Sequence, residues 1–228
     1  MGDAEKKKAW WDIPLTLVVA LSVVLILTTF VAKPFSIPSG SMENTLQVGD
    51  RVLVNKVTYR LRPIQRGDVV VFDGTDSFVP ASDIPQRNPL AGALAWLGQS
   101  VGVMTPDGTD FVKRVIGVAG DHVVCCDATG HVIVNGVPLV ENSYIYSGDD
   151  PSDMAFDVIV PEGALWLMGD HRSNSADSRY HLGDPGGGMV PVNRVIGRVM
   201  NVLWPPNRWQ NIPIPESFDA VPQPKASN

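Results

Sequence analysis

The segment best suited to chemistry is a run of small and hydroxyl residues just after the longest apolar stretch of the chain. Pro38, Ser39, Gly40 and Ser41 form it. A Pro-Ser-Gly-Ser run is by itself a good turn, and in most proteins it is only that. Ser41 lies nine residues beyond Ala32, so even in extended chain it is at most about 30 Å from the end of the apolar stretch. If that stretch is embedded in a bilayer, a serine nucleophile here would act on a substrate held at the membrane surface.

The composition fits metal and nucleic-acid chemistry poorly. The chain has two cysteines and four histidines, without the paired spacing of a zinc site. Eighteen Lys and Arg against 24 Asp and Glu give a net charge of −6, which argues against a phosphate-binding surface. We therefore expect no metal, no cofactor and no nucleic-acid partner.

Residues 13–32 are the candidate membrane anchor. They form a run of 20 residues without a charge, and as a helix this run would be about 30 Å long, the thickness of a bilayer core. Lys6, Lys7 and Lys8 precede it. This positive charge predicts that residues 1–12 are cytoplasmic and that the chain after the anchor lies outside the cell membrane. A cleaved signal peptide is the competing interpretation. It is disfavoured because its apolar core is normally about 7–15 residues and because Phe30 occupies position −3 of the plausible cut after Ala32.

The region 33–204 has the pattern of short strands separated by Gly and Pro turns, with Asn135-Gly136 as a hairpin signal. We expect one mainly antiparallel β domain with Greek-key-like or barrel-like closure. Residues 90–104 suggest a core helix or covered loop, or else a membrane-grazing helix. The tail 205–228 contains six prolines and is expected to be extended and partly mobile. The expected strands are 51–57, 69–72, 111–118, 122–126, 131–134, 137–140, 156–160, 164–168 and 194–203.

Four sequence boxes follow one another in the order and spacing of a known family. They are the Ser-Gly-Ser-Met run at 39–42, Gly-Asp-Val-Val-Val-Phe at 67–72, Val-Lys-Arg-Val-Ile-Gly at 112–117 with Gly120-Asp121, and Gly-Asp-His-Arg-Ser-Asn-Ser-Ala-Asp-Ser-Arg at 169–179. From the anchor to about Val199, the chain resembles the bacterial type I signal peptidases, membrane-bound serine proteases that remove signal peptides. A single span with the N-terminus inside is similar to the Gram-positive and actinobacterial form.

The resemblance implies a Ser–Lys dyad, with Ser41 as nucleophile and Lys113 as general base. A serine hydroxyl needs an adjacent base, and lysine serves only when neutral. With a pKa near 10.4, about one lysine in 2,500 is neutral at pH 7, whereas a pKa of about 8 makes this about one in ten. Such a shift requires desolvation, for which the apolar neighbours of Lys113 are suited, and it predicts an alkaline activity optimum.

The same resemblance assigns supporting roles around the dyad. The N–H of Ser41 and the hydroxyl of Ser39 would form the oxyanion hole. Ser175 would orient the lysine amine, and Asp177 and Arg179 would form an ion pair that supports the site.

Three further residues would line small substrate pockets, namely Phe35, Ile37 and Val112. Alanine-sized residues before the cut would fit there, which gives an Ala-X-Ala preference, although the three also suit plain core packing. The substrate, the signal peptide of a secreted preprotein, would bind as an added strand at the surface of the lipid bilayer.

Departures from the family pattern leave the dyad intact. Asn44 replaces a common proline, and His171 and Ser173 replace a common Asn and Asp, which affects only local turn geometry. His171 resembles a triad histidine but is not needed, since Lys113 supplies the base; the other three histidines read as ordinary polar residues. The sequence does not decide the state of the adjacent Cys125 and Cys126, which could form a strained disulfide, remain two thiols or pair outside the chain.

Two other classes of function compete with the signal peptidase. One is a related Ser–Lys protease dedicated to one substrate, of the pilin-maturation type or a LexA-like self-cleaving regulator. A regulator of that kind would carry a DNA-binding helix-turn-helix where this chain has its apolar stretch. The other is a catalytically inactive, membrane-tethered binding domain, which would have no reason to retain Ser41, Lys113 and Ser175 together.

Overall fold

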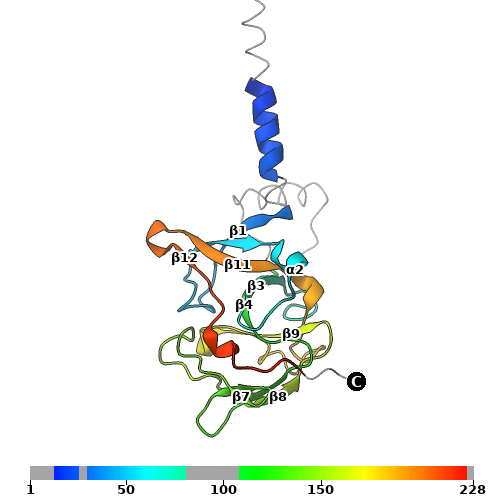
Figure 1. Cartoon of the computed structure of the whole chain (residues 1–228), viewed down its shortest axis with the longest axis vertical. Coiled ribbons are helices and arrows are strands. Elements are labelled where there is room, and N and C mark those ends of the chain that lie inside the picture. The colour runs from blue at the N-terminus through cyan, green and yellow to red at the C-terminus, as the bar shows by residue number, and fades with distance from the viewer. Residues whose placement is uncertain (1–12, 26–29, 81–107, 225–228) are drawn as a thin grey trace, which may run out of the picture.

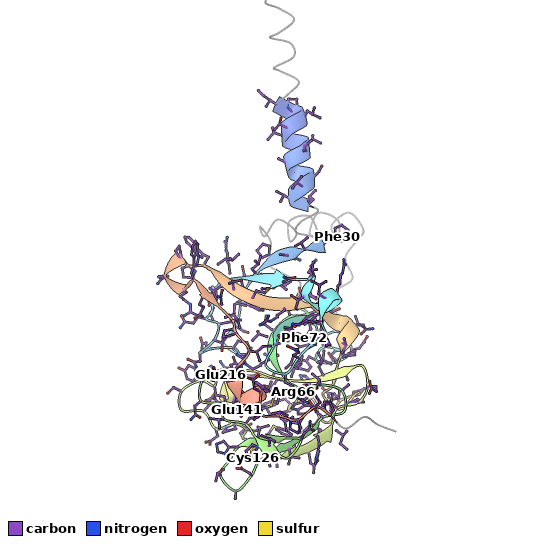
Figure 2. The ribbon with its side chains drawn as sticks, in the orientation of Figure 1. Phe30, Arg66, Phe72, Cys126, Glu141 and Glu216 are labelled. Carbon is purple, nitrogen blue, oxygen red and sulfur yellow. A yellow bond between two sulfur atoms is a disulfide. The ribbon has the colours of Figure 1, made fainter. Side chains whose placement is uncertain are left out.

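The computed structural model describes residues 13–25, 30–80 and 108–224. Residues 13–25 are helical, and their apolar side chains are exposed, Ile13 by 63% and Leu17 by 65% (Figure 2). Among the described helices, none is both long and apolar enough to cross a membrane. Ala32, the expected last residue of the anchor, instead begins the first strand. The expected element at 90–104 lies outside the described residues.

The rest of the chain is mainly antiparallel β structure, as the turn pattern predicts (Figure 1). A large sheet has the strand order β1-β2-β11-β3-β4-β9-β10, with β12 beside β11, and a small sheet has the order β7-β6-β5-β8. Among the described strands the large sheet is curled but ends at β1 and β10, so the predicted barrel-like closure is incomplete. The strands are β1 (Ala32–Ser36), β2 (Arg51–Asn55), β3 (Val69–Asp73), β4 (Asp110–Gly117), β5 (His122–Cys125), β6 (Val132–Val134), β7 (Val137–Pro138), β8 (Phe156–Ile159), β9 (Ala164–Met168), β10 (Val190–Pro191), β11 (Val195–Trp204) and β12 (Gln210–Asn211).

Short helical turns connect these strands. The helix α2 (Thr58–Leu61) follows β2, and the 3-10 turns are η2 (Arg172–Asn174), η3 (Val192–Arg194), η4 (Pro206–Arg208) and η5 (Glu216–Phe218). The hairpin predicted at Asn135-Gly136 is confirmed: both residues have positive φ, 53° and 84°, the backbone that this turn requires.

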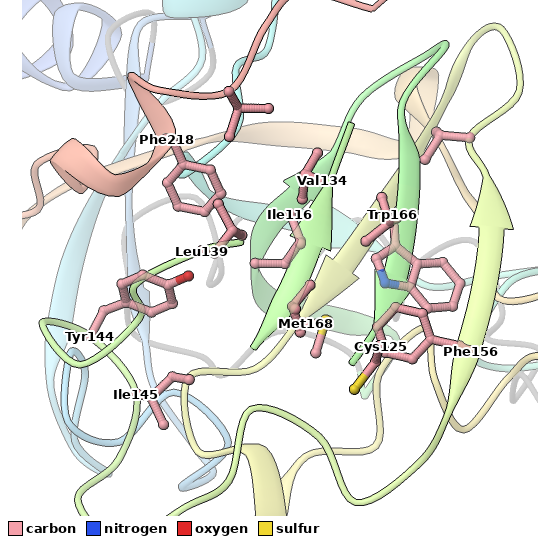
Figure 3. Close-up of a cluster of buried hydrophobic side chains, with 14 of the residues drawn as sticks. Ile116, Cys125, Val134, Leu139, Tyr144, Ile145, Phe156, Trp166, Met168 and Phe218 are labelled. Carbon is pink, nitrogen blue, oxygen red and sulfur yellow. The ribbon is translucent and has the colours of Figure 1, made fainter. Parts of the chain in front are cut away.

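Side chains from both sheets form the largest hydrophobic cluster (Figure 3). Ile116 of β4 and Trp166 of β9 lie in it with Phe156 of the small sheet, and all three are buried. A second cluster lies beneath β1 and β2, and it contains Met42 and Leu46. The two clusters hold the strands that carry the candidate site.

The C-terminal segment, expected to be extended and partly mobile, is described as far as residue 224. Residues 205–224 pack along the domain, and Phe218 and Val221 are buried, 6% and 5% exposed. Arg66 pairs with Asp121 and donates to the carbonyl of Pro222 at 3.1 Å. The proline-rich sequence hides this packing because its few apolar residues have no regular spacing.

The two cysteines, left open by the sequence, form a disulfide with each other across a cis peptide bond. Cys125 lies at the edge of the largest cluster (Figure 3).

Candidate active site

Ser41 begins a single tight turn that follows β1. The amide of Leu46 donates to the carbonyl of Met42 at 2.7 Å, and the side chains of both residues are buried in the second cluster. These two apolar anchors fix the turn to the core. They leave the Ser41 side chain in a buried position beside the sheet, where it is 9% exposed.

Lys113 lies within β4 and pairs in register with Val70 of β3. Its side chain is 3% exposed, and Nζ donates a 2.6 Å hydrogen bond to Oγ of Ser41. Burial lowers the pKa of Lys113 to about 8, although the negative charges of Asp177 and Asp170 act to raise it. The residue is thus a lysine that loses its proton easily, in contact with a serine hydroxyl.

A buried polar network lies behind the dyad. Oγ of Ser175 donates to Oδ2 of Asp177 at 2.7 Å, and the amide of Gly169 donates to the same oxygen at 2.9 Å. Arg179 binds both carboxylate oxygens of Asp177, at 2.8 and 2.9 Å, and neither side chain of this pair is exposed. Burial alone would raise the pKa of Asp177, but the hydrogen bonds and charge of Arg179 outweigh it and lower that pKa. The expected ion pair is therefore formed and ionised.

The Ser175 hydroxyl is not bonded to the lysine amine. Among the described residues, the hydrogen bond of Lys113 Nζ goes to Ser41, and that of Ser175 goes to Asp177. A hydroxyl has one proton and two lone pairs, so Ser175 keeps the capacity to accept from the amine.

A cavity of about 420 Å³ opens beside the dyad. Phe35, Ile37 and Val112, the expected pocket residues, all line it together with Ser41 and Lys113. Ser39 is exposed and also lines the cavity. Phe35 and Ile37 belong to the second cluster as well, so the pocket and core-packing interpretations hold together.

The sequence argument gave no role to a second buried ion pair next to the site. Arg114 and Asp170 are 2% and 0% exposed and are joined by two hydrogen bonds of 2.8 and 2.6 Å. Thr45 of the serine turn donates to the same carboxylate. The signal available was a second charged residue, Arg114, directly after Lys113 in a strand that is mostly apolar, but its partner is 56 residues away.

Gly169 and His171 are two more contacts of the serine turn that the sequence did not reveal. A Cβ on Gly169 would lie 2.5 Å from the carbonyl oxygen of Ser41, so only glycine allows this approach. The amide of His171 donates to that same oxygen at 3.1 Å. The segment 169–171 thus holds the nucleophile turn directly.

The remaining three histidines each pair with a nearby carboxylate: His122 with Asp157, His131 with Asp127 and His181 with Asp184. In the described part of the chain, no three His, Cys, Asp or Glu side chains are grouped as metal ligands would be.

Comparison with known proteins gives the family. The model of "Signal peptidase, peptidase S26" matches residues 10–204. The chain belongs to this signal peptidase family. It is 40% identical to a probable signal peptidase I of Mycobacterium leprae, over 93% of this chain and 82% of that protein. It is 42% identical to signal peptidase I of Mycobacterium tuberculosis, over 84% and 71%, and 37% identical to that of Leptolyngbya laminosa, over 88% and 83%. As a signal peptidase of this family, the chain is a serine endopeptidase that removes signal peptides.

Proposed function

We propose that the chain cuts signal peptides from secreted preproteins after Ala-X-Ala-like sites, with Ser41 as nucleophile and Lys113 as general base. The observation that carries the mechanism is the 2.6 Å contact between Nζ of a buried lysine and Oγ of Ser41. With a pKa of about 8, about one Lys113 in ten is neutral at pH 7.

The neutral amine accepts the Ser41 proton while Oγ attacks the scissile carbonyl carbon. The negative charge that develops on the carbonyl oxygen is stabilised by the N–H of Ser41 and the hydroxyl of Ser39. The Lys113 ammonium then gives its proton to the leaving amine, which becomes the N-terminus of the mature protein. A water molecule hydrolyses the acyl-enzyme, with Lys113 again taking the proton and returning it to Ser41.

Ser175, Asp177 and Arg179 orient the lysine in this mechanism. Arg179 keeps Asp177 ionised, and Asp177 accepts a hydrogen bond from the Ser175 hydroxyl. This leaves the lone pairs of Ser175 Oγ directed away from Asp177, to accept from the lysine amine. The acceptor holds Nζ close to Ser41 in both protonation states.

Substrate recognition is assigned to the cavity lined by Phe35, Ile37 and Val112. Its apolar walls suit the small apolar side chains of an Ala-X-Ala site. Within the described strands β1 pairs only with β2, so its other edge is open to an extended peptide, which can bind there as an additional strand.

The membrane placement completes the proposal. Apolar side chains more than half exposed along residues 13–25 suit a lipid environment better than water. We assign as the anchor the apolar run that begins at Ile13 and ends before the first strand at Ala32. Residues 1–12 would then lie in the cytoplasm and the β domain outside. The signal peptide of the substrate would then lie in the same bilayer, within reach of Ser41.

The test is cleavage of a purified preprotein in detergent by the intact chain and by Ser41→Ala and Lys113→Met. We expect one cut after an Ala-X-Ala site by the intact chain and none by either variant. Binding of the preprotein to both variants shows that they fold. Activity that survives Lys113→Met would contradict the lysine-base mechanism, and inactivity of all three proteins on several preproteins would favour a protease dedicated to one substrate.

A further inference from the structure

His171 holds the two peptide units on either side of the Ser41 Cα atom. Its ring nitrogen Nδ1 lies 3.2 Å from the carbonyl oxygen of Gly40, and its own amide donates to the carbonyl oxygen of Ser41 at 3.1 Å. The ring is stacked on Tyr146, with centroids 4.0 Å apart and planes 15° from parallel. One residue therefore contacts the backbone before and after the nucleophile, and the amide of Glu43 also donates to the Gly40 carbonyl, at 3.0 Å.

The carboxylate of Glu43 determines which ring nitrogen carries the proton. Oε2 of Glu43 lies 3.1 Å from Nδ1 of His171, and the other neighbour of Nδ1 is the Gly40 carbonyl oxygen. Both neighbours are acceptors, so Nδ1 must be the donor.

The Gly40 carbonyl and the Ser41 N–H belong to one planar peptide unit. A donor that fixes the direction of the carbonyl therefore fixes the direction of the N–H. A hydrogen bond accepted by the carbonyl also polarises the peptide and makes its N–H a better donor. That N–H is the proposed oxyanion donor, whose value depends on its alignment before the reaction.

We propose that His171, held by Glu43, is a positioning residue that aligns the oxyanion donor of Ser41. This inference rests on the proposed function of Ser41. It gives His171 no part in proton transfer, because Lys113 already occupies the Ser41 hydroxyl.

The experiment uses the full chain in detergent and three substitutions. His171→Phe keeps a ring for stacking on Tyr146 but removes the donor, His171→Asn retains an N–H donor, and Glu43→Gln removes the charge that orients the ring. His122→Phe is the matched control, since His122 also pairs with a carboxylate but is exposed by 51%. Each protein is assayed for kcat, KM and thermal unfolding. The affinity of each protein is also measured for two ligands. One is a peptide aldehyde, which forms a tetrahedral adduct with serine, and the other is the same peptide with an uncleavable group in place of the scissile amide.

We expect His171→Phe to lower kcat and aldehyde affinity together by about tenfold to a hundredfold, since loss of an oxyanion donor altogether costs about 10²–10³. KM, the affinity for the uncleavable peptide and the unfolding temperature should change little. His171→Asn should recover most of the loss, Glu43→Gln should show a smaller loss of the same kind, and the control should show none. The pH midpoint of kcat/KM should stay where Lys113 sets it in every variant.

Equal losses of aldehyde and peptide affinity, a fall in unfolding temperature that accounts for the lost rate, or unchanged kcat in His171→Phe would each overturn the inference. So would a shifted pH midpoint, which would indicate an acid–base role. Ser41→Ala separates the two proposals: if it still cleaves, the nucleophile is wrong and both fail, whereas any result above with an inactive Ser41→Ala concerns His171 alone.

Discussion

At the scale of the residue, the feature that matters most is the low pKa of Lys113. Burial lowers this pKa to about 8, and the active form is the neutral amine. The proposed rate should therefore rise with pH, being about one tenth of its plateau at pH 7 and one half near pH 8. The check is kcat/KM measured from pH 6 to 10, restricted to conditions in which the chain stays folded. A flat profile between pH 6 and 9 would contradict the lysine base.

Substitution of Asp177 tests whether the charge of this carboxylate acts on the pKa of Lys113. Its negative charge raises the pKa of Lys113, so Asp177→Asn should move the midpoint of the pH–rate profile below 8. The substitution also leaves the buried Arg179 with only the exposed Asp153 as an ionic partner, and breaking the buried pair should cost up to about 3–5 kcal/mol of stability. Both effects are measurable, by the pH profile and by urea unfolding. Asp157→Asn is the exposed control. If the midpoint of the pH–rate profile of Asp177→Asn is unchanged or higher, Asp177 does not act on Lys113 through its charge.

At the scale of the element, the sequence predicts strands well where local pattern decides them. The run 164–168 is buried at every residue and matches β9 at both ends. β3 is one residue longer than its expected span, and β4 is displaced from its expected span by one residue at each end. β1 was not predicted, because its five residues include Pro34 and adjoin an apolar stretch, and only pairing with β2 makes them a strand. The ion pair of Arg114 with Asp170 was not predicted for the same reason, since it depends on contact between segments that are distant in the sequence.

The segment after β9 allows a sharp test of close packing at the site. In Gly169→Ala, the added methyl group would meet the carbonyl oxygen of Ser41 and the side chain of Ser175, both at no more than 2.5 Å. We expect a loss of activity of at least a hundredfold, since the serine turn must shift. Gly183→Ala is the matched control, because a Cβ there meets no atom within 4 Å. Near-normal cleavage by Gly169→Ala would mean that the contact of 169–171 with Ser41 does not hold the turn in place.

At the scale of the whole molecule, the C-terminal segment connects the two ends of the domain. Arg208 binds both oxygens of Asp50, at 2.9 Å each, and the Asp50 carbonyl accepts from the amide of Ile37 in the cavity wall. Farther along, Phe218 packs in the cluster shared by the two sheets (Figure 3). The segment thus links the serine region to the small sheet, an arrangement that composition alone could not reveal.

Burying Lys113 also lowers the free energy of unfolding of the whole molecule. A pKa of about 8 in the folded chain, against about 10.4 when unfolded, corresponds to about 3 kcal/mol. Between these values the unfolded chain binds more protons, so the stability of the native chain rises as pH increases from about 8 to 10.4, and the full penalty applies below pH 8. Lys113→Met fills a similar volume without the charge. It should be more stable than the native chain by about 3 kcal/mol at pH 7, and by little above pH 10.

Urea unfolding of the two proteins at pH 7 and at pH 10 measures the difference. A gain that is the same at both pH values would mean that packing, not desolvation of the ammonium, causes it. A gain confined to the lower pH would show that the fold gives up stability to keep a neutral amine beside Ser41, as expected of a site shaped for catalysis. The inactive variant would then be the more stable protein because the feature that destabilises the native chain is the one that makes its lysine a base.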